Sequence, residues 1–292
     1  MNSRVFLLGA PRSGTTFLYA LLASQPNVLS MPETGFFERW APRRLQHVVL
    51  DGQLSMVACP TGRTARRDLG ASLQELAKKI CSTERVKGRL FFRSYGRDYI
   101  RLLDSAAAAQ RKTVWIEKTP NHLFYLDKIE QLVPNAKFIH LIRKGEDVVA
   151  SCVRASIGYA QLLDKWTFCQ GIPWLTAYWN TATDIHLSTL GRQNHMIVFY
   201  EDVVHDISNT LSRLFEFIGC DVSRWDCTMK LDHIVNLVEE PWKAAALTRH
   251  VATPQHVTDT LFGKDIVSWL TKHLRSYERI RATVLSTRAA RN

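Results

Sequence analysis

The sequence lacks most features that mark membrane, secreted or metal-binding proteins. No apolar run approaches the roughly 18 residues of a membrane-spanning helix, and the run Val5–Leu8 is too short for a signal-peptide core. Its six cysteines include no Cys-x-x-Cys pair and no histidine at zinc spacing, so neither a metal site nor a disulfide scaffold is indicated. We therefore expect a cytoplasmic protein with reduced thiols, no membrane span and no bound metal.

Internal repeats, low-complexity blocks and linkers are also absent, so a single domain over residues 1–292 is expected. With 46% hydrophobic residues the chain can build a sizeable core, which excludes disorder as its main state. Negative charge is scarce, because 38 Lys and Arg outnumber 27 Asp and Glu and give a net charge of +11. This excess favours an anionic partner: a phosphate-rich ligand, nucleic acid or a membrane surface.

Short apolar runs of β type alternate with helical stretches along most of the chain. This alternation predicts an α/β fold with a central parallel sheet covered by helices on both faces. Residues 36–112 have a helical, irregular pattern without strand signal, which predicts a mainly helical insertion that lines the substrate pocket. The predicted strands are Val5–Leu8, Val28–Ser30, Val114–Glu117, Phe138–Ile142 and Ile197–Tyr200, and the predicted helices are Thr15–Ser24, Asn121–Val133, Glu146–Ser156 and Val203–Gly219.

The segment Gly9–Thr16 follows the first predicted strand and opens a helix, an arrangement that wraps a phosphate. Its glycines permit tight turns, and the helix N-terminus adds partial positive charge. The spacing from Gly9 to Gly14 fits the triphosphate pattern G-x-x-x-x-G-K-[ST], but Thr15 stands at the lysine position. The loop is therefore better suited to bind a ligand with a terminal phosphate or phosphosulfate than to catalyse β/γ-phosphate transfer. The plain alternative is a glycine turn that only caps a helix.

A second anion site is predicted after the fourth strand. If a helix begins near Gly145, the Ser151 hydroxyl can meet the same anion as the planar fork of Arg143. Alternatively, Arg143 pairs with Glu146 or Asp147, and Ser151 is an ordinary surface residue of the helix.

These two motifs resemble those of sulfotransferases that use 3′-phosphoadenosine 5′-phosphosulfate (PAPS). The first resembles the 5′-phosphosulfate loop and the second the 3′-phosphate site, and Glu117–Pro120 and Tyr200–Asp202 match as well, so the likeness spans roughly residues 4 to 220. It implies a P-loop-like three-layer α/β/α fold and PAPS as cofactor, with 3′,5′-diphosphoadenosine (PAP) as product. The resemblance implies cofactor binding by Pro11, Arg12, Ser13, Gly14, Thr15, Thr16, Arg143, Ser151 and Tyr200.

The candidate residues Gly9–Thr16, Glu33, Lys118 and Arg143 each come just after a β-like run. In a parallel sheet these points lie at the carboxyl edge of the strands, where doubly wound folds bind ligands. The motifs are therefore expected to meet in one cleft.

Sulfuryl transfer needs a base for the acceptor proton and cations at the leaving phosphate, and it requires no metal in principle. Glu33 stands 33 − 12 = 21 residues after Arg12, a spacing similar to that of the catalytic glutamate in protein-tyrosine sulfotransferases and several bacterial small-molecule relatives. Glu33 is therefore expected to be the general base; alternatively it is a structural carboxylate paired with a cleft Arg or Lys. The resemblance implies that Lys118 reaches the bridging oxygen of PAPS and that Arg12 steadies the departing 5′-phosphate.

Pro120, His122 and Tyr200 also bear on the choice of base and on the contact with the adenine ring. The phenol and steroid sulfotransferases place a catalytic histidine where this chain has Pro120, so that mechanism is excluded at this position. His122 is a fallback base, although a helix capped by Thr119 would carry it into the first turn. Tyr200 matches the family tyrosine near the adenine ring; its alternative is a buried aromatic of the sheet.

The acceptor is expected to be a small alcohol, phenol or amine. A rival reading is a kinase of the same loop architecture acting on a small molecule or nucleoside, against which the missing loop lysine argues. A nucleic-acid binder is disfavoured because the basic residues are spread along the chain without a recognisable motif. Residues 36–99 and 159–190 are expected to line the acceptor pocket with the aromatics Phe36, Phe37, Trp40, Trp166 and Trp174.

Overall fold

The computed structural model describes most of the chain at the level of secondary structure. None of its described helices is long and apolar enough to cross a membrane. The described residues are 3–40, 43–48, 53–58, 63–82, 84, 92–158, 171–225 and 261–290.

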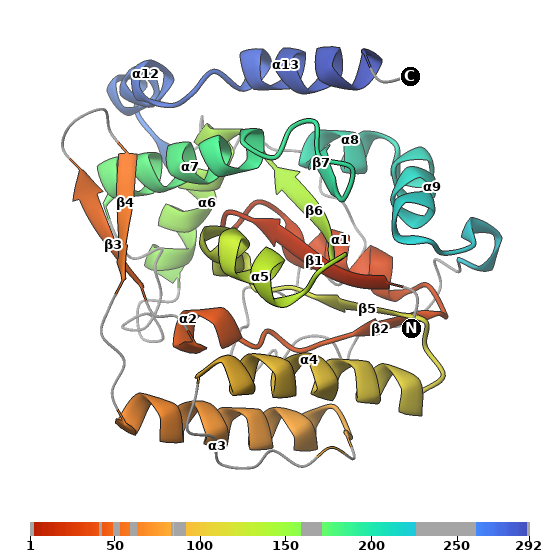
Figure 1. Cartoon of the computed structure of the whole chain (residues 1–292). Coiled ribbons are helices and arrows are strands. Elements are labelled where there is room, and N and C mark those ends of the chain that lie inside the picture. The colour runs from red at the N-terminus through yellow and green to blue at the C-terminus, as the bar shows by residue number, and fades with distance from the viewer. Residues whose placement is uncertain are drawn as a thin grey trace.

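A parallel sheet of five strands forms the centre of the molecule (Figure 1). Its strands are β1 (Ser3–Gly9), β2 (Val28–Ser30), β5 (Val114–Glu117), β6 (Lys137–Ile142) and β7 (His195–Phe199). They lie in the order β2-β5-β1-β6-β7, and each neighbouring pair is parallel. The chain leaves β1 toward β2 on one side and later crosses from β5 to β6 on the other. The order therefore reverses between β1 and β6, and a ligand crevice is expected at their carboxyl ends.

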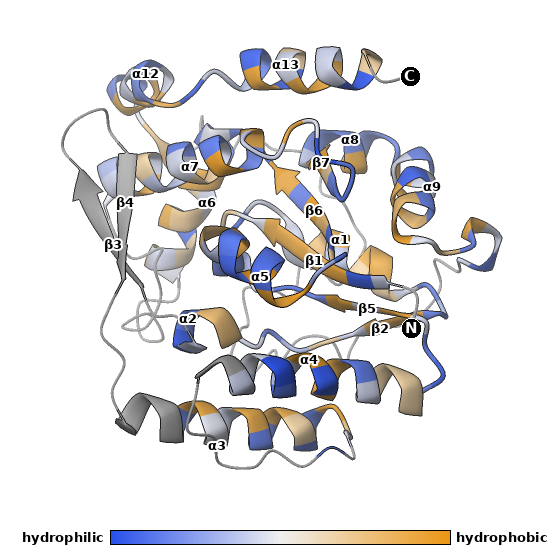
Figure 2. Cartoon of the chain, in the orientation of Figure 1, coloured by the Kyte–Doolittle hydropathy of each residue, from blue (hydrophilic) through white to orange (hydrophobic). Residues whose placement is uncertain are grey.

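Both faces of the sheet are apolar, as its buried strands require (Figure 2). In β1, Phe6 and Leu8 point into one core, while Val5 and Leu7 point into the other, and all four side chains are fully buried. The expected α/β fold with helices on both faces is confirmed.

The helices divide between the two cores. The core around Val5 and Leu7 is covered by α1 (Thr15–Ala23), α8 (Tyr200–His205) and α9 (Ile207–Ile218), with the short turn η4 (Val222–Arg224) at its margin. The core around Phe6 and Leu8 is covered by α2 (Phe36–Trp40), α3 (Arg63–Lys79), α4 (Phe92–Ala109), η1 (Pro120–Tyr125), α5 (Leu126–Leu132), α6 (Gly145–Gly158), α7 (Ile172–Leu187), α12 (Lys264–His273) and α13 (Tyr277–Ala289).

The insertion between residues 36 and 112 is mainly helical, but the expectation that it lacks strands is wrong. Strands β3 (Arg43–Val48) and β4 (Gln53–Ala58) pair antiparallel as a separate hairpin, which lies beside α7 (Figure 1). Their sequences mix polar and apolar residues without a clear alternation, so they carry little strand signal of their own. The Asp51-Gly52 pair in the sequence between them is a typical hairpin signal and was the available clue.

The predicted helix Val203–Gly219 is broken in two. Asp206 has an extended backbone, with φ of −144° and ψ of 82°, and its side chain accepts a hydrogen bond from Asn209 N at the start of α9. Asp206 is thus the N-cap of a new helix. A capping residue can therefore end one helix and start another even where the apolar periodicity continues through it.

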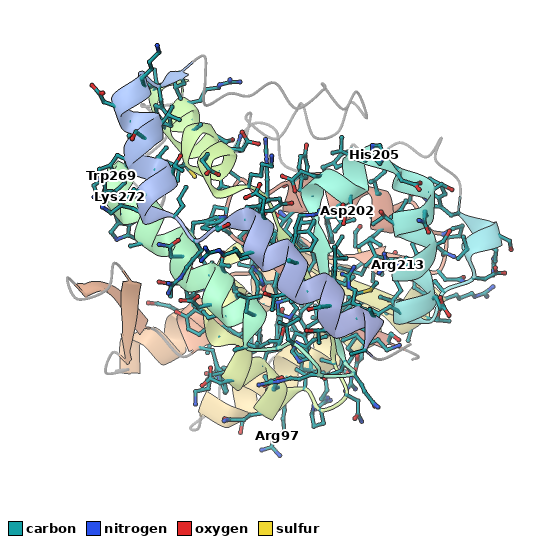
Figure 3. All side chains as sticks on the ribbon, turned by 90° about the horizontal axis from the view of Figure 1, so that it is seen from above. Arg97, Asp202, His205, Arg213, Trp269 and Lys272 are labelled. Atoms are coloured by element: carbon teal, nitrogen blue, oxygen red, sulfur yellow. The ribbon has the colours of Figure 1, made fainter. Side chains whose placement is uncertain are left out.

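Helix α13 covers β7, the strand at one edge of the sheet. Arg281 forms an ion pair of 2.8 Å with Asp202, which Figure 3 labels, and its guanidinium lies 4.7 Å from the centre of the Phe199 ring. Farther along α13, Arg288 donates a hydrogen bond to the backbone carbonyl oxygen of Ile197. The helix therefore binds both side chains and backbone of the edge strand.

Three histidines form a hydrogen-bonded chain beside β6 and β7. His140 Nδ1 lies 2.8 Å from His186 Nδ1, and His140 Nε2 lies 2.9 Å from His195 Nδ1. His195 Nε2 lies 2.9 Å from a carboxylate oxygen of Glu130. Because an ionised carboxylate only accepts, each neutral ring can donate one N–H toward Glu130 and accept from the next ring. With all three rings neutral, each contact of the chain has one donor and one acceptor.

We expect the free energy of unfolding to fall as the pH drops below 6.5. Burial lowers the pKa of His186 from 6.5 to about 3, and burial beside His186 and His195 lowers the pKa of His140 well below 6.5. Below pH 6.5 the unfolded chain therefore binds more protons than the folded chain, which costs about 1.4 kcal/mol per pH unit for each histidine.

Urea unfolding at about pH 7.5, 6.5 and 5.5 measures this dependence. His186→Gln should reduce the slope by about one proton, because it removes one of the buried rings. Equal slopes for His186→Gln and the parent chain would contradict the assignment of neutral buried rings.

Candidate active site

The loop between β1 and α1 is wound as an anion-binding turn. Arg12 and Gly14 both have left-handed backbone conformations, with φ of 68° and 91°. Left-handed residues within a turn are typical of concave backbone nests, and a non-glycine residue such as Arg12 adopts this conformation at a cost. Ser13 N donates to Ala10 O at 3.1 Å. The predicted strand, turn and helix therefore follow one another as expected.

Neither glycine of this loop leaves room for a side chain. A Cβ at Gly9 would lie 2.8 Å from the carbonyl oxygen of Leu141 and 2.9 Å from Thr15 Cγ2. At Gly14 it would lie 2.4 Å from two ring carbons of Tyr200. The loop is packed tightly against β6 and α8, and glycine is required at both positions.

Gly14→Ala is expected to lower the melting temperature and, if the loop binds PAP as the resemblance implies, to weaken PAP binding at least tenfold. The left-handed backbone alone costs a residue with a Cβ about 1–2 kcal/mol, and the methyl group must also displace the Tyr200 ring. Calorimetric titration with PAP and a thermal melt measure the two effects. Gly158→Ala is the matched control, since no heavy atom lies within 4 Å of its added Cβ. Comparable losses in both variants would show that close packing at Gly14 is not the cause.

Arg143 and Ser151 lie next to the glycine loop, as the second motif predicts. Arg12 Nε donates to Ser151 Oγ at 3.2 Å, and Arg143 Nη1 donates to the backbone oxygen of Arg12 at 3.5 Å. Arg143 Nε is buried without a hydrogen-bond partner, and Arg143 Nη2 lies 3.7 Å from a carboxylate oxygen of Asp147. The alternative pairing with Asp147 is thus present, yet it leaves one guanidinium donor unsatisfied. The Arg12 side chain extends to the second motif, which the sequence did not indicate.

Tyr200 joins the two motifs. The Arg143 guanidinium lies 4.6 Å from the centre of its ring, and the Phe17 ring meets it edge-on at 6.3 Å. Burial raises the pKa of Tyr200, so the phenol is neutral at physiological pH. The residue is half-buried and begins α8 instead of ending β7. Its ring packs against Gly14 of the loop, and the Arg143 guanidinium lies over its face.

Lys118 connects the glycine loop to Glu33. It follows β5, its side chain is 3% exposed, and its Nζ donates to Thr16 Oγ1 at 3.3 Å. The same Nζ contacts a carboxylate oxygen of Glu33, whose side chain remains 25% exposed. The three residues come from the carboxyl ends of β5 and β2 and from the start of α1, so the expected convergence at this edge is found.

Glu117 is a buried carboxylate to which the sequence assigned no role. It accepts hydrogen bonds from Thr119 Oγ1 at 2.6 Å, from Thr34 Oγ1 at 3.0 Å and from Thr34 N at 3.3 Å. Burial alone would raise its pKa, but His122 and these hydrogen bonds hold the pKa of Glu117 below its ordinary value. Glu117 therefore fixes Thr34, the neighbour of Glu33, to the residue that follows Lys118. The position of a glutamate at the end of an apolar strand is the sequence feature that could have indicated this role.

His122 lies in the core behind this network. It is fully buried in the η1 turn; its Nδ1 lies 2.9 Å from Glu117 Oε2, and its Nε2 accepts from Phe37 N at 3.3 Å. Pro120 stands at the start of this turn with Thr119 before it, as expected, although Thr119 makes no capping hydrogen bond. With both ring nitrogens engaged, His122 supports Glu117.

The aromatic residues expected to line the acceptor pocket are largely buried, and Phe36 also lines a cavity beside Glu33. Phe36 and Phe37 are buried, and Phe36 stacks on Tyr99 with ring centroids 4.0 Å apart. Trp40 and Trp174 are half-buried against the same core, and Trp166 lies outside the described residues. Phe36, Phe37 and Trp40 pack α2 onto the core, because large apolar side chains at a domain interior bury most of their area. Among the described residues, no group of three or more His, Cys, Asp or Glu could hold a metal ion.

Known proteins resemble this chain over most of its length. A model of the sulfotransferase family matches residues 4–224. The nodulation protein NoeE of Sinorhizobium fredii is 32% identical over 150 residues, which cover 50% of this chain and 30% of that protein. The protein-tyrosine sulfotransferase of Drosophila melanogaster is 24% identical over 246 residues, which cover 80% of this chain and 40% of that protein. The chain spans half or less of the length of the curated relatives it matches.

Solved structures share the same fold. The sulfotransferase domain from the curacin biosynthetic pathway aligns with a TM-score of 0.56 at 20% identity, over 94% of this chain and 99% of that one. A mouse sulfotransferase complexed with PAP aligns with a TM-score of 0.50 at 12% identity, over 99% and 90%. These alignments confirm the P-loop-like α/β fold. The family match over residues 4–224 establishes that the chain belongs to the sulfotransferase family.

Proposed function

We propose that the chain transfers the sulfuryl group of PAPS to a hydroxyl or amine of a small-molecule acceptor, with Glu33 as general base. The observation that carries this proposal is the contact of Lys118 Nζ with both Thr16 of the glycine loop and Glu33. It joins an anion-binding loop, a buried cation and a partly exposed carboxylate at one sheet edge. Such a group of side chains suits transfer of an anionic group to an acceptor that must lose a proton.

The residues present fit PAPS. The left-handed turn at Arg12 and Gly14 suits one phosphate group, and the unsatisfied buried Nε of Arg143 beside Ser151 suits a second. The structural neighbour complexed with PAP supports the same ligand. Pro11 to Thr16, Arg143, Ser151 and Tyr200 are the proposed binding residues. When bound, PAPS supplies an activated sulfuryl group on a phosphate leaving group.

Glu33 and Lys118 have complementary parts in this proposal. The Glu33 carboxylate can accept the proton of an acceptor hydroxyl, and Lys118 and Arg12 supply positive charge beside the loop where negative charge develops. The alternative role, a structural carboxylate paired with a cleft lysine, agrees with the contact to Lys118. However, a purely structural carboxylate has no need for 25% exposure, whereas a base must be reached by its acceptor.

The kinase alternative has less support. The loop places Thr15, not lysine, before Thr16, and the Lys118 side chain contacts Thr16 and Glu33 instead. In nucleotide triphosphatases that loop lysine holds the β- and γ-phosphates. The acceptor class is proposed as a small molecule because the spacing from Arg12 to Glu33 resembles that of bacterial small-molecule sulfotransferases, while the protein-tyrosine sulfotransferase relatives leave a peptide tyrosine as a competing acceptor.

Calorimetric titration with PAP in the presence of EDTA, compared with ATP and magnesium, tests the proposal first. We expect micromolar PAP binding, no comparable ATP binding, and PAPS turnover that survives EDTA. Tight ATP binding only with magnesium would favour the kinase, and binding of neither ligand would overturn both enzymatic assignments.

A further inference from the structure

A cavity of about 230 Å³ opens beside Glu33, between the segment that follows β2 and the helix α3. Pro32, Glu33 and Thr34 form one side, and Leu69, Leu73 and Lys79 are among the α3 residues on the other. We propose that this cavity binds the acceptor and selects a hydroxyl compound with a small apolar body and an anionic group. This inference rests on the proposed function, since Glu33 borders both the cavity and the glycine-loop site.

The cavity has one apolar wall. Phe36, Leu69, Leu73 and Leu76 line it and are each at most 8% exposed, so their side chains belong to a rigid core. Its volume is below the range of about 300–1,000 Å³ that is usual for drug-sized ligands. The wall can therefore cover one ring or a short chain, but not a large lipid.

The remaining lining is charged. Arg39 and Lys79 contribute two cations, and Glu33 and Glu75 contribute two carboxylates; with Lys118, which contacts Glu33, the sum is 3 − 2 = +1. Glu38, the other carboxylate of this region, accepts from Asn121 and does not line the cavity. An acceptor that carries an anionic group is therefore favoured over a cationic one.

The two cations are available to such a group. Arg39 is held in place by a hydrogen bond from its Nη2 to the Thr34 carbonyl oxygen, which leaves further donors of its planar fork for a carboxylate. Lys79 pairs with Glu75 at 2.8 Å, but the two side chains are 61% and 66% exposed, so the pair is weak and exchangeable. The acceptor hydroxyl would lie at Glu33, its body on the leucines and its anionic group at Arg39 and Lys79.

Three acceptors of the same size test the charge preference. Para-hydroxyphenylacetate, para-hydroxyphenylethanol and tyramine share a phenol and differ in carrying a negative, no or a positive charge. With PAPS as donor we expect kcat/KM for the acid to exceed that of the neutral alcohol at least tenfold, as one charge-assisted hydrogen bond can provide. Tyramine should be the poorest acceptor. A preference for the alcohol or for tyramine would overturn the proposal.

Substitutions then assign the preference to the cavity. Arg39→Gln and Lys79→Gln should raise KM for the acid about tenfold each, with little change in kcat or in turnover of the neutral alcohol, and Arg39→Lys should restore part of the loss. Lys78→Gln is the matched control, because Lys78 is exposed on the same helix but does not line the cavity. Equal effects of Lys78→Gln and Lys79→Gln would refute the cavity as the acceptor site.

Failure of this inference can be distinguished from failure of the proposed function. Sulfation of all three phenols without dependence on Arg39 would keep the sulfotransferase and remove the cavity assignment. If no phenol is sulfated, titration of the protein with para-hydroxyphenylacetate alone decides: binding lost in Arg39→Gln and kept in Lys78→Gln supports the cavity, and binding unaffected by Arg39→Gln overturns it.

Discussion

Glu33→Gln is expected to lower kcat by about 10²–10⁴ while leaving the Kd for PAP nearly unchanged, the range typical for loss of a general base. The amide keeps the shape of the side chain, and its oxygen can still accept from Lys118 Nζ, so the arrangement of the site should persist. It cannot, however, take up a proton. Single-turnover measurements with PAPS, together with calorimetric titration of PAP, separate the loss of chemistry from any loss of binding.

Glu38→Gln is the control for this experiment. Glu38 lies five residues farther along and accepts from Asn121 at 3.2 Å, outside the contact between Lys118 and Glu33. Its substitution should change kcat little. Unchanged turnover in Glu33→Gln would remove Glu33 from the mechanism, and an equal fall in PAP affinity would reassign it to cofactor binding.

Arg143→Ala is expected to weaken PAP and PAPS binding alike, by about 10²-fold. Hydrogen bonds to charged groups contribute about 1.5–3 kcal/mol each, and about 1.4 kcal/mol corresponds to a factor of ten. The Arg143 side chain is 14% exposed and one of its donors is buried without a partner, which supports the proposal that Arg143 binds a phosphate group. Calorimetric titration with both nucleotides measures the change.

Two further variants sharpen this result. Arg143→Lys keeps the positive charge but loses the planar fork, so its affinity should fall between those of the parent and Arg143→Ala. Arg154→Ala, at an exposed arginine of the same helix α6, should leave binding unchanged. Affinity in Arg143→Ala equal to that of the parent would refute the assignment of a phosphate site to this residue.

The central sheet was predictable because its strands are buried on both faces and therefore appear as short continuous apolar runs. All five predicted strands coincide with strands of the sheet within two residues. The hairpin of β3 and β4 was missed because most of each strand mixes polar and apolar residues, as in Arg43-Arg44-Leu45-Gln46-His47. The break at Asp206 was missed because a single cap decides it, whereas the surrounding periodicity continues through it.

For the candidate site, too, one part could be predicted from the sequence and another could not. Its positions could be predicted, because a glycine loop or a charged residue at the end of a strand is visible in the sequence. The partners could not, since they depend on how strands far apart in the sequence meet. Arg12 reaches Ser151, 139 residues away, and Thr34 reaches Glu117, 83 residues away. Composition does not distinguish a ring that faces a ligand from one that faces the core: Phe36 lines the cavity beside Glu33, whereas Phe37 is fully buried in the core.

Helix α13 has a consequence for association with other chains. An open parallel sheet ends in strands whose outer backbone groups can pair with any exposed strand. Here β2 is only three residues long, and β7 is covered by α13 through Arg281 and through the bond from Arg288 to the Ile197 carbonyl. A chain shortened before Tyr277 would expose β7 along one side, together with the part of the core that Tyr277, Ile280 and Val284 cover. We expect such a chain to self-assemble through strand pairing at concentrations where the chain with α13 stays dispersed.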